Sequence, residues 1–288
     1  MGTARGQNVK STYQMNPNQD HVVLKIERVG KVFFPGTVDE VQALSEVDLE
    51  VREGDFISII GSNGAGKSTL LNIVAGVFPP EKGGKILLNG NDVTHLPEYK
   101  HSAYVGRVWQ QPGVGTAANM TIEENMSMAI MRGKRRGLRP AINKNRQSTY
   151  KKALATLDLN LENRLSAIVG TLSGGQRQAL SLIMATISKP SVLLLDEHIA
   201  TLDPKTANIV MELTDKVIKS ENMTSMMVTH NMEMALKYGN RLVMMHEGKI
   251  VVDIHQVDKQ ALTIDDLIAS FEKAAGQKFR DDKVLLSR

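Results

Sequence analysis

The sequence of 288 residues contains no cysteine, which excludes a disulfide framework and any cysteine-ligated metal site and suits a reducing cytosol. It has no run of eighteen apolar residues, so we predict no bilayer-spanning segment, and residues 1–20 lack the apolar stretch of a secretory signal. Five tyrosines, six phenylalanines and one tryptophan are too few for a base-stacking surface, so we expect no nucleic-acid partner. Any work at a membrane therefore requires another chain to supply the span.

The net charge is +4, but the positive charge is concentrated in a basic segment between Arg132 and Lys152. This segment carries nine lysines and arginines and no acid, and taking these nine from +4 leaves −5 for the rest of the chain. Two interpretations stay open: a solvated helical surface, or contact with anionic lipid headgroups. Nucleic acid is a weaker third, because Tyr150 is the only aromatic residue among these charges.

Alternating strand-like and helical segments predict an α/β fold. Strands are predicted at 22–29, 47–51, 56–60, 85–88, 104–109, 191–195 and 225–228, with a terminal hairpin of 241–245 and 249–254. Helices are predicted at 68–77, 121–131, 141–157, 174–188, 204–220 and 263–275. Three of these begin with capping signals, which are the capping box Thr121 to Glu124, Asp203 before a proline, and Thr263 before two acids.

The strongest local motif is GSNGAGKST, which fits the phosphate-loop pattern G-x-x-x-x-G-K-[ST]. A predicted strand precedes it and a predicted helix follows, so its backbone N–H groups and the positive helix end can face phosphate oxygens. Lys67 is predicted to neutralise the β- and γ-phosphates of ATP, and Ser68 to offer its hydroxyl to Mg²⁺. The predicted phosphate-binding residues are Gly61, Ser62, Asn63, Gly64, Ala65, Gly66, Lys67, Ser68 and Thr69.

A second motif, VLLLDEH, is an apolar strand that ends in two carboxylates. Asp196 stands where a Mg²⁺ ligand is needed, and Glu197 stands where a base can polarise the attacking water. An apolar run followed by Asp-Glu is weak evidence alone. It gains weight because a phosphate loop requires a carboxylate partner.

The run Leu172-Ser-Gly-Gly-Gln, followed by Arg177 and Gln178, resembles the signature of ABC ATPases. Ser173, Gly174, Gly175 and Gln176 form a second predicted anion site at a helix N-terminus. The resemblance implies a RecA-like P-loop core with an antiparallel β subdomain and an inserted α-helical subdomain. It also implies a head-to-tail dimer in which each ATP lies between the phosphate loop of one copy and the signature of the other.

Further family elements follow in order. The resemblance makes Gln110 a residue that reaches Mg²⁺ and the attacking water, Asp203 part of the D-loop at the nucleotide, and His230 the switch histidine at the γ-phosphate. Phe33 resembles the aromatic residue that stacks on adenine, with Phe34 as a competitor or either as core. The other histidines show no metal-ligand spacing.

The resemblance covers about residues 22–255. The expected organisation is a disordered tail at 1–20 (with Met15 a candidate native start), the ATPase core at 21–111 and 169–255, the helical subdomain at 112–168, and a C-terminal helical extension at 256–288. One departure is His198, where family members usually carry proline. It is either a tolerated variant or a residue that alters water positioning at Glu197.

The resemblance implies an ATP-binding, ATP-hydrolysing subunit of a transporter, at the cytoplasmic face of the membrane, with transmembrane permease subunits and a separate substrate-binding protein as partners. Soluble ABC proteins that act on ribosomes or DNA fit less well, because the chain has one module and no long coiled coil. A degenerate nucleotide sensor is disfavoured by Glu197 and His230.

The resemblance favours import of a small solute such as an amino acid, with export as the alternative. The stretches around Asp196 and His230 are similar to bacterial uptake ATPases assigned to an amino-acid substrate such as tryptophan or tyrosine. The stretch at 36–44 is also similar to exporters of the macrolide or lipoprotein type.

Overall fold

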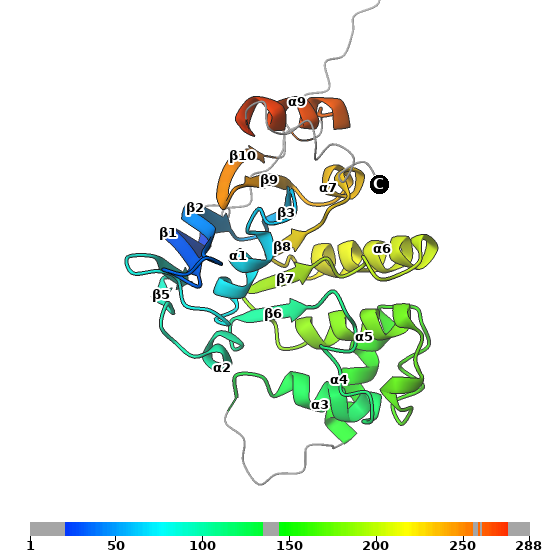
Figure 1. Cartoon of the computed structure of the whole chain (residues 1–288). Helices are drawn as coiled ribbons and strands as arrows, with labels where there is room; N and C mark the ends of the chain where they lie inside the picture. Colours follow the sequence, from blue (N-terminus) through cyan, green and yellow to red (C-terminus); the bar gives the residue numbers. More distant parts are fainter. Residues whose placement is uncertain (1–20, 135–143, 256–258, 260, 276–288) are drawn as a thin grey trace, which may run out of the picture.

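The computed structural model describes residues 21–134, 144–255, 259 and 261–275. Within them two β-sheets lie next to each other, and helices flank the larger sheet (Figure 1). The predicted tail at 1–20 lies outside the described residues, as do residues 135–143 of the basic segment and the end of the chain beyond 275. None of the helices described is both long and apolar enough to span a bilayer.

The smaller sheet is antiparallel and has the strand order β2-β1-β4-β5. Its strands are β1 (Val22–Phe33), β2 (Val41–Arg52), β4 (Lys85–Leu88) and β5 (Asn91–Asp92). The first two are longer than the predicted 22–29 and 47–51. Residues 41 and 42 are exposed and the β1–β2 register shifts several times, so this part of the hairpin lacks a regular burial pattern.

The larger sheet has the strand order β10-β9-β3-β8-β7-β6. Its strands are β3 (Phe56–Gly61), β6 (Val105–Val108), β7 (Val192–Asp196), β8 (Ser225–Val228), β9 (Arg241–His246) and β10 (Lys249–His255). All neighbours are parallel except β9 and β10, which form the predicted terminal hairpin. Parallel strands with both faces covered read as continuous apolar runs, which is the pattern of β3 and β7.

The helices mostly match their sequence signals. They are α1 (Lys67–Val74), α2 (Glu98–His101), α3 (Ile122–Ile130), α4 (Lys144–Ala155), α5 (Gly174–Thr186), α6 (Pro204–Ser220), α7 (Met232–Lys237) and α9 (Ile264–Ala275), with a 3-10 turn η1 (Val169–Thr171). Thr121 and Glu124 form the predicted capping box, and Asp203 caps α6. The short helices α2 and α7 were not predicted, because one turn or two carry no clear periodicity.

The larger sheet separates two cores. Ile57, Ile59 and Leu194 point to the core shared with α1 and the smaller sheet. Leu193 and Leu195 point to the core formed with helices α3 to α6. Alternation along each strand therefore fixes α1 on one face and the helical segment on the other.

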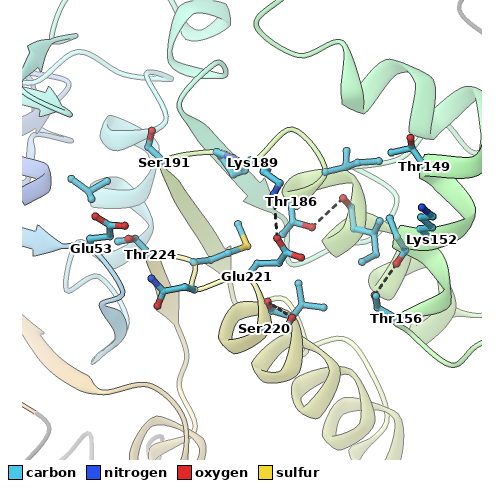
Figure 2. A pocket seen from close by; sticks show the side chains of 18 of the residues that line it. Glu53, Thr149, Lys152, Thr156, Thr186, Lys189, Ser191, Ser220, Glu221 and Thr224 are labelled. Atoms are coloured by element: carbon cyan, nitrogen blue, oxygen red, sulfur yellow. Dashed lines mark hydrogen bonds and ion pairs between the residues drawn. The ribbon is translucent and has the colours of Figure 1, made fainter. Parts of the chain in front are cut away.

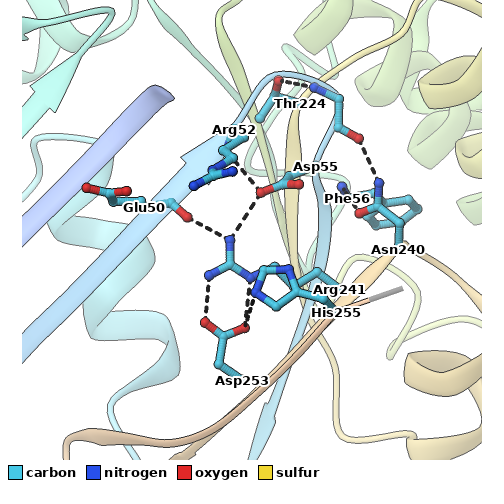
Figure 3. Close-up of polar contacts among 10 residues, drawn as sticks. Glu50, Arg52, Asp55, Phe56, Thr224, Asn240, Arg241, Asp253 and His255 are labelled. Atoms are coloured by element: carbon cyan, nitrogen blue, oxygen red, sulfur yellow. Dashed lines mark hydrogen bonds and ion pairs between the residues drawn. The ribbon is translucent and has the colours of Figure 1, made fainter. Parts of the chain in front are cut away.

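Arg241 joins the two sheets (Figure 3). Its guanidinium donates to the carbonyl of Glu50 on β2 at 2.6 Å and forms a two-pronged ion pair with Asp253 on β10 at 2.6 and 2.8 Å. It also donates to Asp55 at 3.1 Å. Since the side chain is 7% exposed, these bonds hold β2, β9 and the start of β3 together in a site largely shielded from water.

Candidate functional site

The predicted phosphate loop connects the carboxyl end of β3 to α1. Gly66, the N-cap of α1, has a φ of 95°, and a Cβ added there would lie 2.4 Å from the carbonyl oxygen of Ala43. Only glycine is compatible with both this conformation and this close approach. The loop therefore passes tightly under β2 and leaves the first N–H groups of α1 free of side-chain caps.

Lys67 folds back over the loop. Its Nζ donates to the carbonyl of Gly61 at 2.7 Å and to that of Ser62 at 2.8 Å. Burial lowers the pKa of Lys67, while the charges of Glu197 and Asp196 act in the opposite direction. The ammonium group of Lys67 is thus held by two loop carbonyls, and a phosphate oxygen could take their place as its hydrogen-bond acceptor.

Ser68 and Asp196 meet where α1 begins and β7 ends. The Ser68 hydroxyl donates a long hydrogen bond of 3.4 Å to Asp196 Oδ1, and both oxygens are hard ligands for a metal ion. Such a pair fits Mg²⁺, which takes few protein ligands and completes its shell with phosphate oxygens and water. The metal role of both residues stays a prediction.

Glu197 and His230 also lie together. His230 Nε2 is 2.6 Å from Glu197 Oε1. Glu197 adopts a φ of 46°, which is uncommon for a residue with a side chain, and its N–H donates to the carbonyl of Val228 at 3.1 Å. Two of the three predicted catalytic side chains, from the segments that follow β7 and β8, therefore lie together beside Asp196.

The predicted signature residues lie at the start of α5. Ser173 is its N-cap and forms a capping box with Gln176. A Cβ at Gly175 would lie 2.4 Å from Thr206 Cγ2, so glycine lets α5 pack tightly on α6. Asp203 accepts from the N–H of Thr206 at 3.1 Å and acts here as a helix cap. Helices α1 and α5 lie apart in Figure 1, so the structure does not bring the two predicted anion sites of one chain together.

Gln110 lies two residues after the end of β6 and is exposed. Its carbonyl accepts from the Thr201 hydroxyl at 3.2 Å, and the carbonyl of Trp109 accepts from Gln178 on α5 at 3.0 Å. The loop that begins at Gln110 is thereby anchored to both the signature helix and the predicted D-loop.

Sequence reasoning missed Arg107. It lies in β6 between buried neighbours, and its guanidinium donates to Asp196 Oδ2 and to Asn72 Oδ1 on α1, each at 2.7 Å. The available signal was a single arginine within an otherwise apolar strand, which requires a buried partner.

Phe33 packs edge-on against Phe78, with ring centroids 5.4 Å apart. Phe34 is 66% exposed and has a φ of 53° in the turn after β1. Phe34 is thus the freer of the two rings, and stacking of Phe33 on adenine remains a prediction.

His198 points away from the candidate site into the core under α6. It is 1% exposed, and its Nε2 lies 3.2 Å from the Thr214 hydroxyl. That hydroxyl donates to the carbonyl of Val210 at 2.8 Å, so it accepts the Nε2 proton of a neutral imidazole. Burial lowers the pKa of His198 to about 4.

A cavity of about 650 Å³ lies elsewhere, between α4 and the starts of β7 and β8 (Figure 2). Ser191 and Thr224, which precede these strands, line it together with Thr149 and Lys152 of α4. Asp196 marks the opposite, carboxyl end of β7. Ligands of open α/β sheets bind at the carboxyl ends of the strands, so this cavity is not the candidate nucleotide site.

The fold and these motifs define a P-loop ATPase. The family model described as ABC transporter matches residues 44–200. The chain is 44% identical over 253 residues to a tyrosine transport ATP-binding protein of Clostridioides difficile (strain R20291), covering 88% of this chain and 100% of the relative. It is 33% identical over 232 residues to the lipoprotein-releasing system ATP-binding protein LolD of Coxiella burnetii, covering 79% and 94%. The chain belongs to the ABC transporter family.

The solved structures agree. The dimeric post-hydrolysis structure of the ATP-binding cassette MJ0796 bound to ADP and Pi superposes with a TM-score of 0.68 at 26% identity, covering 81% of this chain and 98% of that one. The predicted family and ABC ATPase fold are confirmed. ABC cassettes are dimeric ATP-hydrolysing enzymes that use ATP with Mg²⁺ and work with transmembrane permease subunits, which confirms those predictions.

Proposed function

We propose that this chain energises the import of an amino acid, tyrosine or tryptophan, through a permease at the cytoplasmic face of the membrane, with a separate binding protein delivering the solute. The observation that carries this proposal is the 44% identity over the full length of a relative named for tyrosine transport. The chain itself supplies the ATPase, and its partners recognise the solute.

We also propose roles for the site residues. Glu197 accepts a proton from the attacking water while His230, 2.6 Å away, holds its carboxylate and faces the γ-phosphate. The loop around Lys67 and the signature at Ser173 of a second copy bind the phosphates. Mg²⁺, held through Ser68 and Asp196 with Gln110 nearby, would neutralise phosphate charge when bound. Asp203, in the D-loop, would face the nucleotide at the dimer interface.

A hollow of about 870 Å³ between α2 and α3 supports a permease partner. Leu96, Tyr99 and Met128 line it and are 40%, 69% and 42% exposed, and Val114 on the adjoining loop is 61% exposed. A gathering of exposed apolar side chains marks a contact site. Because the loop from Gln110 borders this hollow, we propose that residues 112–168 form the helical subdomain that receives a cytoplasmic permease segment.

The docking role can be tested by co-purification. Val114→Glu is expected to abolish recovery of the chain with its permease, because a charge enters an apolar contact. Val38→Glu is the matched control, since Val38 is fully exposed in the β1–β2 turn, and it should leave recovery unchanged. Equal recovery of both variants would place the permease elsewhere.

The import role is tested with the chain and its permease reconstituted in liposomes. Tyrosine or tryptophan, added with the proposed binding protein, should stimulate ATP hydrolysis and enter the lumen, and Glu197→Gln should stop both. The similarity to LolD favours a second candidate, a lipoprotein- or macrolide-type exporter. Stimulation by those substrates and not by amino acids would replace the import proposal.

A further inference from the structure

Arg107 is a largely buried arginine on an edge strand of the larger sheet. It lies on β6, and its side chain is 9% exposed. Enclosing a guanidinium is costly unless its donors are paired. Two of its nitrogens donate to side chains of different elements, Nη1 to Asn72 of α1 and Nη2 to Asp196 of β7, while its buried Nε has no partner among the described residues.

The contact with Asp196 divides that carboxylate between two tasks. Oδ2 accepts from Arg107 at 2.7 Å, while Oδ1 faces the Ser68 hydroxyl at 3.4 Å. A carboxylate with one oxygen held by an enclosed arginine cannot rotate freely. Arg107 therefore fixes which oxygen of Asp196 faces the phosphate loop.

The same guanidinium is stacked on Trp109. Its central carbon is 3.6 Å from the centroid of the indole ring. A planar guanidinium over an indole is a favourable contact as well as a steric one. The backbone of Trp109 is bonded in turn to Gln178, and that of Gln110 to Thr201. The Arg107 guanidinium, which holds Asp196, thus packs against Trp109, next to the loop that begins at Gln110. That loop borders the proposed permease contact.

We propose that Arg107 is a positioning residue: it orients Asp196 toward the Mg²⁺–nucleotide site and joins that carboxylate, through its stack on Trp109, to the loop that begins at Gln110. This rests on the proposed metal role of Asp196. A displacement of the loop would shift Trp109, then the guanidinium, then the carboxylate. The link needs charge, planarity and two donor directions at once, which only arginine supplies.

The first test measures how nucleotide binding depends on Mg²⁺, with a fluorescent ATP analogue titrated at fixed free Mg²⁺ concentrations. In Arg107→Met the Mg²⁺ concentration that gives half of the Mg²⁺-dependent gain in affinity should rise about tenfold, since groups that orient a metal ligand contribute about 10- to 100-fold. Affinity without Mg²⁺ should stay within about twofold of the wild type. Arg107→Lys keeps the charge but not the fork, and should show a rise of about threefold.

The second test uses the only tryptophan of the chain. Emission of Trp109 should change when Mg²⁺ and ATP are added to the wild-type protein, and this response should be lost in Arg107→Met. Lys216→Met is the matched control, because Lys216 pairs with Asp158 on the exposed side of α6 and should keep both the Mg²⁺ midpoint and the emission response.

The inference is overturned when Arg107→Met, folded as judged by its circular dichroism, keeps the wild-type Mg²⁺ midpoint or the wild-type emission response. If that variant does not fold, Arg107→Lys decides, and an unshifted midpoint in it overturns the inference. Failure of the wild-type protein to bind ATP in a Mg²⁺-dependent way would instead refute the proposed function.

Discussion

Lowering the pH from about 7.5 to about 5 is expected to destabilise the fold through the buried imidazole of His198. His198 is 1% exposed, and its one described partner is the Thr214 hydroxyl, which accepts the Nε2 proton. Within the part of the chain that the structure describes, Nδ1 has no partner, so a second proton on the ring would be buried without an acceptor. The native state therefore holds His198 neutral.

The sign and the size follow from the two pKa values. Burial lowers the pKa of native His198 from 6.5 to about 4, while the unfolded chain keeps the ordinary value. Between these values the unfolded state binds more protons, so this contribution is fully present above pH 6.5 and is lost as the pH falls toward 4. At about pH 5 the free energy of unfolding should be about 2 kcal/mol smaller than at about pH 7.5 from this residue alone.

The assay is urea unfolding at both pH values, followed by far-ultraviolet circular dichroism and by Trp109 emission, with coincident transitions required. His198→Gln is the control, because its amide can donate to Thr214 but does not titrate. The wild-type protein should lose about 2 kcal/mol more than this variant between the two pH values. Equal losses, within about 0.5 kcal/mol, would show that His198 does not carry this pH dependence.

Three further changes test other parts of the structure. Glu197→Gln should keep ATP binding and lower the hydrolysis rate at least about a hundredfold, and an unchanged rate would remove Glu197 as the base. Lys67→Ala should weaken ATP binding by about 2 kcal/mol, roughly thirtyfold in Kd by calorimetry, and retained affinity would contradict its phosphate role. Arg241→Met should lower the free energy of unfolding by about 3 kcal/mol, while Lys219→Met at an exposed ion pair should cost less than about 1 kcal/mol. Similar losses in the last two would mean that Arg241 does not bind the sheets together.

The sequence predicted those parts of the site that are contiguous in the chain. The phosphate loop from Gly61 is readable because its glycines, lysine and hydroxyl all act through local backbone geometry. Asp196 and Glu197 could be predicted because two acids after an apolar run mark the carboxyl end of a buried strand. The strand order was not readable, because it depends on pairings such as β3 with β8 that no local pattern specifies.

Arg107 and His198 show why the rest was missed. The role of each depends on a partner that is not adjacent in sequence: Arg107 contacts Asp196, and His198 contacts Thr214. A buried arginine indicates that the fold supplies a partner for it, but the sequence does not identify that partner. For His198 the sequence left open an effect on water positioning, and the structure directs its ring into the core under α6, so any such effect acts through the backbone of Glu197.

Trp109 lies between the two parts of the chain that we propose bind nucleotide. Its ring stacks on the Arg107 guanidinium, which donates to Asn72 of α1 on the phosphate-loop side. Its carbonyl accepts from Gln178 on the helix that carries the signature. In the head-to-tail dimer that we propose, these two parts would bind different ATP molecules. A single permease contact beside Gln110 would therefore act on both nucleotides at once, and hydrolysis at the two sites would be coupled within each chain as well as across the dimer interface.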